Sequence, residues 1–399
     1  MMITDLQAAL QAQKCAAWLF YDHHHRDPIA YRVLGLPEDS MVTRRWYYLV
    51  PAVGEPVKLV HRIEAGVLDP LPGERRVYSR WSELRDQLRA LVTPLGPSPR
   101  VAMQYSPGCS LPPISLADAG TVEQLRCFGC EVVGSGDLIS RFDAVWSAAM
   151  LASHRAAGRV IDETITAAFQ FVRAQLDAGV ALHEYELQQW MMERMSRAGL
   201  AGGEPPIVAV NAHAGDPHYQ PGATGSATIL PGDLLLLDVW GRTHQPGSAY
   251  YDVTWMGYCL RPGESTPPTH FEQAFSLVRD ARDAGIARIL AATAAGRPLH
   301  GFEVDQAVRA VIEAAGLGEF FVHRTGHSLG REVHATGANM DDFETHDDRL
   351  LLPFTALTIE PGLYCPNGQP FGVRSEVNMF VGEHGAEVTS PRQQQIVRI

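Results

Sequence analysis

The chain has 399 residues, of which 46% are hydrophobic and 20% charged, a composition typical of a globular protein with room for two or three domains. Its formal net charge is -12 and no basic run stands out, which argues against nucleic acid or an anionic membrane as a main partner. No apolar stretch is long enough for a membrane-spanning helix, and the first residues lack the apolar core of a secretion signal. Six cysteines are too few for a disulfide framework in such a chain, so we expect a cytoplasmic location.

Residues 1–140 have the pattern of a small mixed α/β domain, because strand-like and helical segments alternate along them. In chain order we expect a helix at 3–16, a strand at 16–21, strands in RRWYYLV and PVKLVHRI, a helix at 81–91 and a strand in VAMQY. The segment SPGCSLPPIS is predicted to be a loop inside this domain.

Residues 141–399 are expected to form a second domain with helices and strands in separate runs. A long helix is predicted from 143 to 178, because apolar residues recur there at the helical period. The elements expected after it are a helix at 183–197, strands at 206–211, 234–240 and 250–260, helices at 268–295 and 303–315, and a strand-rich remainder.

Four carboxylates and one histidine in this second domain are hard to explain by packing alone. They are Asp238, Asp252, His327, Glu360 and Glu376, each in or beside an apolar, strand-like segment. An ionised carboxylate in a buried strand is costly unless it is paired or bound to a metal. Oxygen ligands with one imidazole suit divalent ions such as Mn, Co, Fe or Zn, so the set predicts a site for two such ions.

Asp238 and Asp252 lie near the facing ends of two predicted strands. The intervening GRTHQPGSAY is rich in turn-forming residues, so an antiparallel hairpin could aim both carboxylates at one point. The alternative for Asp238 is a strand-end carboxylate that caps a loop.

The other candidates stand in loops or at strand ends. His327 follows a glycine in HRTGHSLG, where the backbone can approach closely; a turn histidine bonded to the backbone is the alternative. Glu360 precedes a proline, which restricts it to extended geometry, and a solvent-facing strand residue is the alternative for it and for Glu376. His218, in NAHAGDPHYQPG, could bind substrate or move a proton, because the pKa of imidazole lies near neutrality.

With these motifs in place, residues 145–399 resemble the pita-bread metallopeptidases of the M24 type, which include Xaa-Pro aminopeptidases, prolidases and methionine aminopeptidases, with creatinase as a metal-free relative. The order Asp, Asp, His, Glu, Glu is the family's ligand order, and the segments GHSLGREVH, TIEPGLY, VRSEV and DPHYQP match its short motifs. Residues 1–140, with LFYDHHHRDPIAYRVLGL, resemble the N-terminal domain of the creatinase and prolidase branch. The resemblance implies a creatinase-like α/β domain over 1–140 and an α+β pita-bread catalytic domain over 141–399.

The resemblance also implies a ligand set for two divalent ions, with manganese favoured over Co, Fe or Zn. One ion would be held by Asp252, His327, Glu360 and Glu376, and the other by Asp238, Asp252 and Glu376. A hydroxide that bridges the ions would attack the substrate carbonyl, and Glu360 would accept the proton of the attacking water.

Two histidines outside the ligand set would handle the substrate. His218 and His334 would orient it and stabilise the tetrahedral oxyanion, and His334 follows His327 at the family's spacing. The expected reaction is cleavage of Xaa-Pro bonds in dipeptides or at peptide N-termini, and a homodimer is expected because relatives with this N-terminal domain often form one.

The chain departs from the family pattern at positions that shape the substrate pocket. The loop between Asp238 and Asp252 is a few residues longer than usual, and Ala335 replaces the glutamate that usually follows the second histidine. The segment VTWM replaces the usual residues after Asp252, which predicts that Trp255 lies near the metals. Asn211 is also farther from the next substrate-binding histidine than usual. The exact substrate therefore stays open.

Two other functions remain possible from the sequence. One is a non-peptidase enzyme on the same scaffold, either a metal-dependent lyase or a C–N hydrolase of a small metabolite. The other is a catalytically inactive binding module, which the complete set of ligand-type residues disfavours because inactive relatives usually lose ligands.

Overall fold

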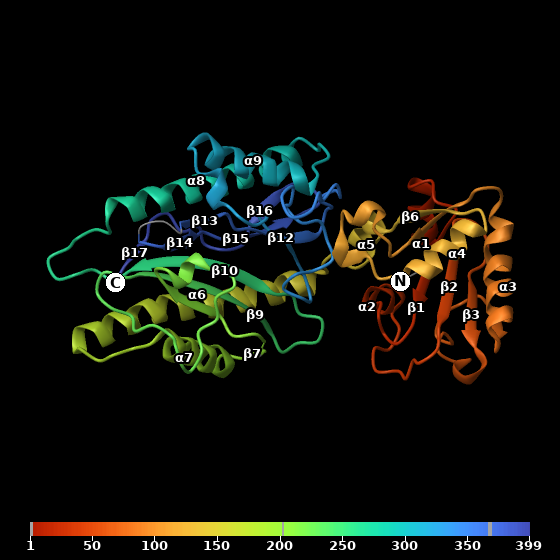
Figure 1. Ribbon diagram of the computed structural model, residues 1–399, viewed down its shortest axis with the longest axis horizontal. Helices are drawn as coiled ribbons and strands as arrows, with labels where there is room; N and C mark the ends of the chain where they lie inside the picture. Colours follow the sequence, from red (N-terminus) through yellow and green to blue (C-terminus); the bar gives the residue numbers. More distant parts are fainter. Residues whose placement is uncertain (1–2, 202, 366–368) are drawn as a thin grey trace. The chain divides into compact units, whose positions relative to one another are not determined.

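The computed structural model describes residues 3–201, 203–365 and 369–399. The chain divides into two compact units, Met1–Asp143 and Ala144–Ile399, which Figure 1 colours from red to yellow and from yellow to blue. The domain boundary expected after residue 140 falls inside α5 (Gly136–Phe142), the last helix of the first unit. No helix in the described part of the chain is long and apolar enough to cross a membrane.

The first unit is built on a six-stranded sheet with the strand order β4-β3-β2-β1-β5-β6. Alternate residues of β1 enter two separate apolar clusters, Trp18 and Phe20 on one face and Leu19 and Tyr21 on the other, so both faces of the sheet are covered. The elements are α1 (Ile3–Ala12), β1 (Ala17–Asp22), α2 (Pro28–Leu34), β2 (Trp46–Pro51), β3 (Val57–His61), β4 (Glu74–Tyr78), α3 (Trp81–Val92), β5 (Arg100–Met103), α4 (Ala119–Cys127), β6 (Glu131–Gly134) and α5.

Several local expectations for this unit were wrong. The first helix stops at Ala12 instead of residue 16, because the chain turns through Lys14 at a φ of 55° before it enters β1. The edge strand β4 was missed because its sequence, ERRVY, is polar and largely exposed, so it lacks the apolar pattern of a buried strand.

The second unit places curved sheets between two helix pairs, with α6 and α7 on one side and α8 and α9 on the other (Figure 1). Its helices are α6 (Ala148–Ala178), α7 (Glu184–Arg197), α8 (Thr269–Ala294) and α9 (Gly301–Ala314). Its strands are β7 (Leu200–Ala201), β8 (Ile207–Val210), β9 (Leu234–Thr243), β10 (Tyr251–Tyr258), β11 (Ser328–Leu329), β12 (Thr355–Ile359), β13 (Gly362–Cys365), β14 (Phe371–Arg374), β15 (Val377–Val381), β16 (Ala386–Val388) and β17 (Val397–Arg398).

The long helix α6 starts five residues later than expected. Ser147 is its N-cap and accepts a hydrogen bond from the backbone of Met150, and Gly179 ends the helix in the left-handed region at a φ of 66°. The predicted start at residue 143 was wrong because Asp143 is the C-cap of α5 and the chain runs without helix from there to Ser147.

Strand β9 shows how the second unit is layered. Leu235 and Leu237 join the apolar cluster that contains α6 and α7, whereas Leu234 and Leu236 join the cluster that contains α8 and α9. Because side chains alternate along a strand, Asp238 shares the face of Leu234 and Leu236. This face, toward α8 and α9, is where the remaining candidate residues gather.

Candidate metal centre

The β9–β10 hairpin brings the two aspartates to the same face of the sheet. Thr254 pairs directly with Asp238, and Asp252 pairs with Trp240. Directly paired residues of antiparallel strands point to the same side, so Asp238, Thr254 and Asp252 share one face. The connecting loop is shorter than the ten residues expected, because β9 continues to Thr243.

Trp255 lies on the opposite face of β10. It packs against the cluster of α6 and α7 residues, so the expectation that it lies near the metals was wrong. The alternation of the strand explains the result, since Trp255 is an odd number of residues from Asp252.

A second set of strands supplies His327, Glu360 and Glu376. In the β12–β15 ladder Ile359 pairs with Val377, so Glu360 and Glu376 flank the same end of that ladder. His327 precedes β11, and its backbone N–H and C=O bond to the hydroxyl and N–H of Thr358 on β12, at 3.0 and 2.8 Å. Asn378 joins this sheet to β10, because its side chain bonds to both the N–H and the C=O of Asp252.

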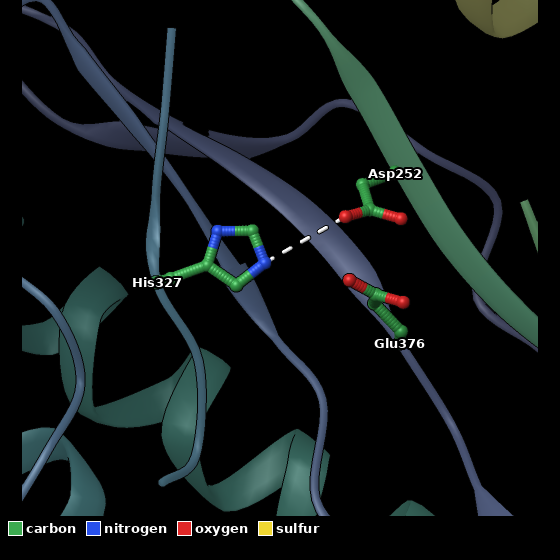
Figure 2. Close-up of side chains that lie close together, drawn as sticks. All are labelled: Asp252, His327 and Glu376. Atoms are coloured by element: carbon green, nitrogen blue, oxygen red, sulfur yellow. Dashed lines mark ion pairs between the residues drawn. The ribbon is translucent and has the colours of Figure 1, made fainter. Parts of the chain in front are cut away.

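Three of the five predicted ligands meet closely, as Figure 2 shows. One ligand atom each from Asp252, His327 and Glu376 all lie within 4.8 Å of one another, and the three side chains are buried. Glu360 lies beside this group, with Oε1 3.3 Å from Nε2 of His327. Asp238 stands next to Arg374.

The imidazole of His327 is oriented as a metal ligand would be. Its Nδ1 lies 3.1 Å from the carbonyl oxygen of Ser328; since a carbonyl can only accept, Nδ1 carries the proton. The lone pair of Nε2 then faces carboxylate oxygens of Asp252 at 3.6 Å and Glu360 at 3.3 Å. Acceptor atoms that face one another in this way are stabilised by a cation between them. A hydrogen bond from the other ring nitrogen, here Nδ1, is typical of histidine ligands.

Two buried carboxylate oxygens also indicate that the site binds a cation. Oδ1 of Asp252 and Oε1 of Glu376 are buried and have no hydrogen-bond partner within the described residues. Burial and the neighbouring carboxylates, including Glu360, raise the pKa of Asp252 and of Glu376 well above the ordinary value. Unsatisfied buried acids of this kind are explained by a bound cation, so the donor set fits divalent metal.

Arg374 is the positive charge of the site. It is buried and donates to Asp238 Oδ2 at 2.5 Å, Thr254 Oγ1 at 3.0 Å and the Tyr364 hydroxyl at 2.9 Å. Burial raises the pKa of Asp238 to about 7, although Arg374 acts to lower it. Arg374 is two residues before Glu376 in the chain, but in space its ion-pair partner is Asp238.

The sequence had missed several residues that complete this network. Thr254 donates to Glu376 at 2.9 Å, and the Tyr364 hydroxyl lies 2.7 Å from Nε2 of His323. Signals for them existed, since Thr254 is two residues from Asp252 on the same strand face. Tyr364 also lies inside the TIEPGLY motif, and His323 is four residues before His327.

Glu360 differs electrostatically from the other carboxylates. Burial alone would raise its pKa, but the rings of His327 and His323 and the nearby arginines outweigh burial and lower it. Thr358 also donates to Oε1 of Glu360 at 3.1 Å. Glu360 is therefore the acid of the group that is most readily ionised without metal.

The two histidines expected to handle substrate keep part of their side chains accessible to solvent. The ring of His334 stands edge-on to that of His327, with 4.4 Å between ring centroids. His327 and burial lower the pKa of His334 to about 4, and His218 adds to this effect, so His334 is neutral at physiological pH. His218 precedes Tyr219 on the loop after β8, and its backbone N–H bonds to Asp216.

Buried carboxylates and a histidine on facing sheets, enclosed by two helix pairs, define the metal-dependent peptidase class with the pita-bread fold. Residues 152–383 match the model of metallopeptidase family M24, and the chain belongs to this family. The fold and the metallopeptidase class expected from the sequence are thus confirmed.

Relatives and solved structures agree with this assignment. The probable dipeptidase PepE of Mycobacterium tuberculosis is 28% identical over 342 residues, which cover 85% of this chain and 81% of the relative. A putative Xaa-Pro aminopeptidase of Mycoplasma pneumoniae is 29% identical over 208 residues, 50% of this chain and 51% of the relative. The crystal structure of dipeptidase PepE from Mycobacterium ulcerans superposes with a TM-score of 0.69 at 22% identity, covering 100% of this chain and 96% of that one.

A fourth similarity is to another solved structure. The Xaa-Pro dipeptidase of Bacillus anthracis superposes with a TM-score of 0.63 at 19% identity, covering 100% of this chain and 99% of that one. At this level of identity the structural likeness establishes the fold.

Proposed function

We propose that this chain is a dinuclear metallopeptidase that cleaves Xaa-Pro bonds, in dipeptides or at the N-terminus of short peptides. The observation that carries the proposal is the meeting of Asp252, His327 and Glu376 within 4.8 Å, with two unsatisfied buried carboxylate oxygens among them. The dipeptidase and Xaa-Pro names of the relatives support the substrate class.

In this proposal Asp252, His327, Glu360 and Glu376 hold one divalent ion, and Asp238, Asp252 and Glu376 hold the other. Manganese is the favoured metal, and Co, Fe and Zn suit the same ligands. Two such ions, when bound, polarise the scissile carbonyl and lower the pKa of a water molecule.

Residues of the protein carry out proton transfer, oxyanion stabilisation and substrate orientation. Glu360, which its lowered pKa keeps ionised, accepts the proton of the attacking water. His334, neutral because its pKa is about 4, donates a hydrogen bond to the developing oxyanion. His218 orients the peptide from the loop after β8. Arg374 stays fixed on Asp238 and offsets part of the negative charge of the site.

The test is hydrolysis of a panel of Xaa-Pro dipeptides, Xaa-Pro tripeptides and matched Xaa-Ala peptides by purified protein with manganese bound. We expect turnover of the proline peptides, loss of turnover after chelation, and recovery when manganese is added. Metal analysis should give two ions per chain. Bound metal without turnover of any peptide would contradict the proposal and favour a non-peptidase reaction on this scaffold. A homodimer and a cytoplasmic location stay predictions from the sequence.

A further inference from the structure

Glu184, the first residue of α7, is a fully buried carboxylate on which four donors converge. They are the backbone N–H of Val210 at 2.8 Å, the backbone N–H of Ala227 at 2.8 Å, Nδ1 of His213 at 2.9 Å and the hydroxyl of Tyr219 at 2.6 Å. Because a carboxylate can only accept, Nδ1 of His213 carries the proton. Both oxygens are thus fully used, which is how a buried carboxylate without an arginine or lysine partner is stabilised.

These four donors bracket one loop. Val210 ends β8, and Ala227 lies at the far end of the loop, where its carbonyl also accepts from the backbone N–H of Glu184 at 3.0 Å. Between them, His213 and Tyr219 stack with their ring centroids 4.3 Å apart. A single carboxylate therefore fixes both ends and two interior points of residues 211–226.

The loop carries His218, directly before Tyr219. Within the described residues the ring of His218 has no hydrogen bond of its own; its backbone N–H bonds to Asp216 at 3.0 Å. The position of this side chain is consequently set by the backbone of the loop, which the hydroxyl of Tyr219, one residue on, ties to Glu184.

On its other side the same loop packs against a strand that leads to the metal centre. The 3-10 turn His213–Gly215 packs against β14, the strand that ends in Arg374. A β-carbon placed on Gly372 of that strand would come within 1.8 Å of the carbonyl oxygen of Ala214. The loop therefore lies directly on the strand that leads to the site, and Glu184 holds it there.

We propose that Glu184 is a positioning residue for the peptidase reaction, which holds His218 in its substrate-binding place through Tyr219 and His213. The inference rests on the proposed function, in which His218 contacts the peptide. Glutamine at position 184 would place N–H donors against donors, because its amide has only one acceptor oxygen.

The experiment compares Tyr219→Phe, Glu184→Gln, His218→Ala and the double variant of Tyr219→Phe with His218→Ala, all loaded with manganese. Tyr219→Phe keeps the stacked ring and removes one hydrogen bond to Glu184, so it is the milder probe if Glu184→Gln folds poorly. The matched control is Glu186→Gln, on the exposed side of the same helix turn, where glutamine keeps the capping box.

We expect Tyr219→Phe to lower kcat/KM for an Xaa-Pro dipeptide by about 10- to 100-fold, the effect of one hydrogen bond to a charged group. Metal content should stay unchanged, as should the activity of Glu186→Gln. In the His218→Ala background, Tyr219→Phe should have almost no further effect, because both changes remove the same function. Backbone hydrogen exchange of residues 211–219 should become faster in Tyr219→Phe, while β9 and β10 stay protected.

Equal effects of Tyr219→Phe with and without His218 would overturn the inference, because Glu184 would then not act through that ring. Unchanged backbone hydrogen exchange of residues 211–219 in Tyr219→Phe would overturn the inference as well. Failure of the proposed function would look different: wild-type protein with bound metal would hydrolyse no Xaa-Pro peptide, while the exchange comparison would still decide whether Glu184 holds the loop.

Discussion

Arg374 donates from Nη2 to Oδ2 of Asp238 across 2.5 Å, although 136 positions separate the two residues in the chain. Asp238 is the predicted ligand with its own guanidinium partner, whereas Asp252 and Glu376 keep unsatisfied oxygens. The charge of Asp238 is therefore compensated by Arg374 at all times, whereas the charges of Asp252 and Glu376 depend on a bound metal for compensation.

Replacing Arg374 with methionine should destabilise the metal-free protein strongly. Breaking a buried ion pair leaves an uncompensated charge and costs about 3–5 kcal/mol. Urea unfolding of the metal-free protein measures the change. The control is Arg155→Met, which breaks an exposed pair with Glu387 and should cost about 0–1 kcal/mol. A similar loss of unfolding free energy in both variants would show that the buried pair contributes no more to stability than the exposed pair.

Glu376→Gln should have opposite effects on the metal-free and the metal-loaded protein. The pKa of Glu376 is raised well above normal by burial and by Asp252, so the charged form is unfavourable without metal and a neutral glutamine should raise the melting temperature. With manganese, the wild type should gain more stability than the variant. Activity should fall by about 100-fold or more, since even the outer hydrogen-bond partners of metal ligands contribute up to that much. A metal-free variant less stable than wild type would contradict this reading.

The contribution of His154 to the stability of the protein should decrease as the pH falls from about 6.5 to 4. This histidine of α6 is buried, and burial lowers its pKa from 6.5 to about 4. Its Nδ1–H donates to the Tyr250 carbonyl at 2.7 Å, and Nε2 lies 2.8 Å from the Thr389 hydroxyl. At this position the folded state binds fewer protons than the unfolded state, so the contribution of His154 is complete above pH 6.5 and is lost as the pH falls, by about 3 kcal/mol in total.

The measurement is urea unfolding between pH 4 and 8 for the wild type and His154→Gln. The variant can still donate and accept hydrogen bonds, and it should show a smaller slope between pH 4 and 6.5. The exposed His384→Gln serves as the control, with an unchanged slope expected. Equal slopes for all three proteins would exclude His154 as the source.

Gly372→Ala, on β14, should displace the loop that carries His218. An added β-carbon would meet the Ala214 carbonyl oxygen at 1.8 Å, and such overpacking costs about 1–3 kcal/mol and forces the backbone to shift. We expect a rise in KM for Xaa-Pro dipeptides with two ions still bound. Gly215→Ala, whose nearest contact would be 3.8 Å away, should behave like the wild type. Normal kinetics in Gly372→Ala would show that the loop tolerates displacement.

Strand periodicity accounts for what the sequence could predict about the site. The apolar run before Asp238 and the hairpin to Asp252 predicted two carboxylates aimed together, and the observed register places them on one face. The same periodicity contradicted the placement of Trp255 near the metals, because an odd separation from Asp252 puts it on the α6 side. That error came from analogy with the family pattern where the local rule was sufficient.

Other errors arose where local sequence carried little information. The polar edge strand β4 lacks an apolar pattern, and the start of α6 depends on the capping residue Ser147 and on the preceding helix α5. Helix ends and edge strands bury little apolar surface, so periodicity constrains them weakly.

By itself, the sequence determined the types and order of the ligand residues, the helix pairs and the central hairpin, because these follow from residue chemistry and from periods of 3.6 and 2. Only the tertiary structure decided that Arg374 pairs with Asp238 and that Glu184 accepts a hydrogen bond from Tyr219 in the loop of His218. Both relationships join segments distant in the chain, and they depend on strand register and on packing between layers. No local pattern encodes such contacts, since they form only when the sheets and helices come together.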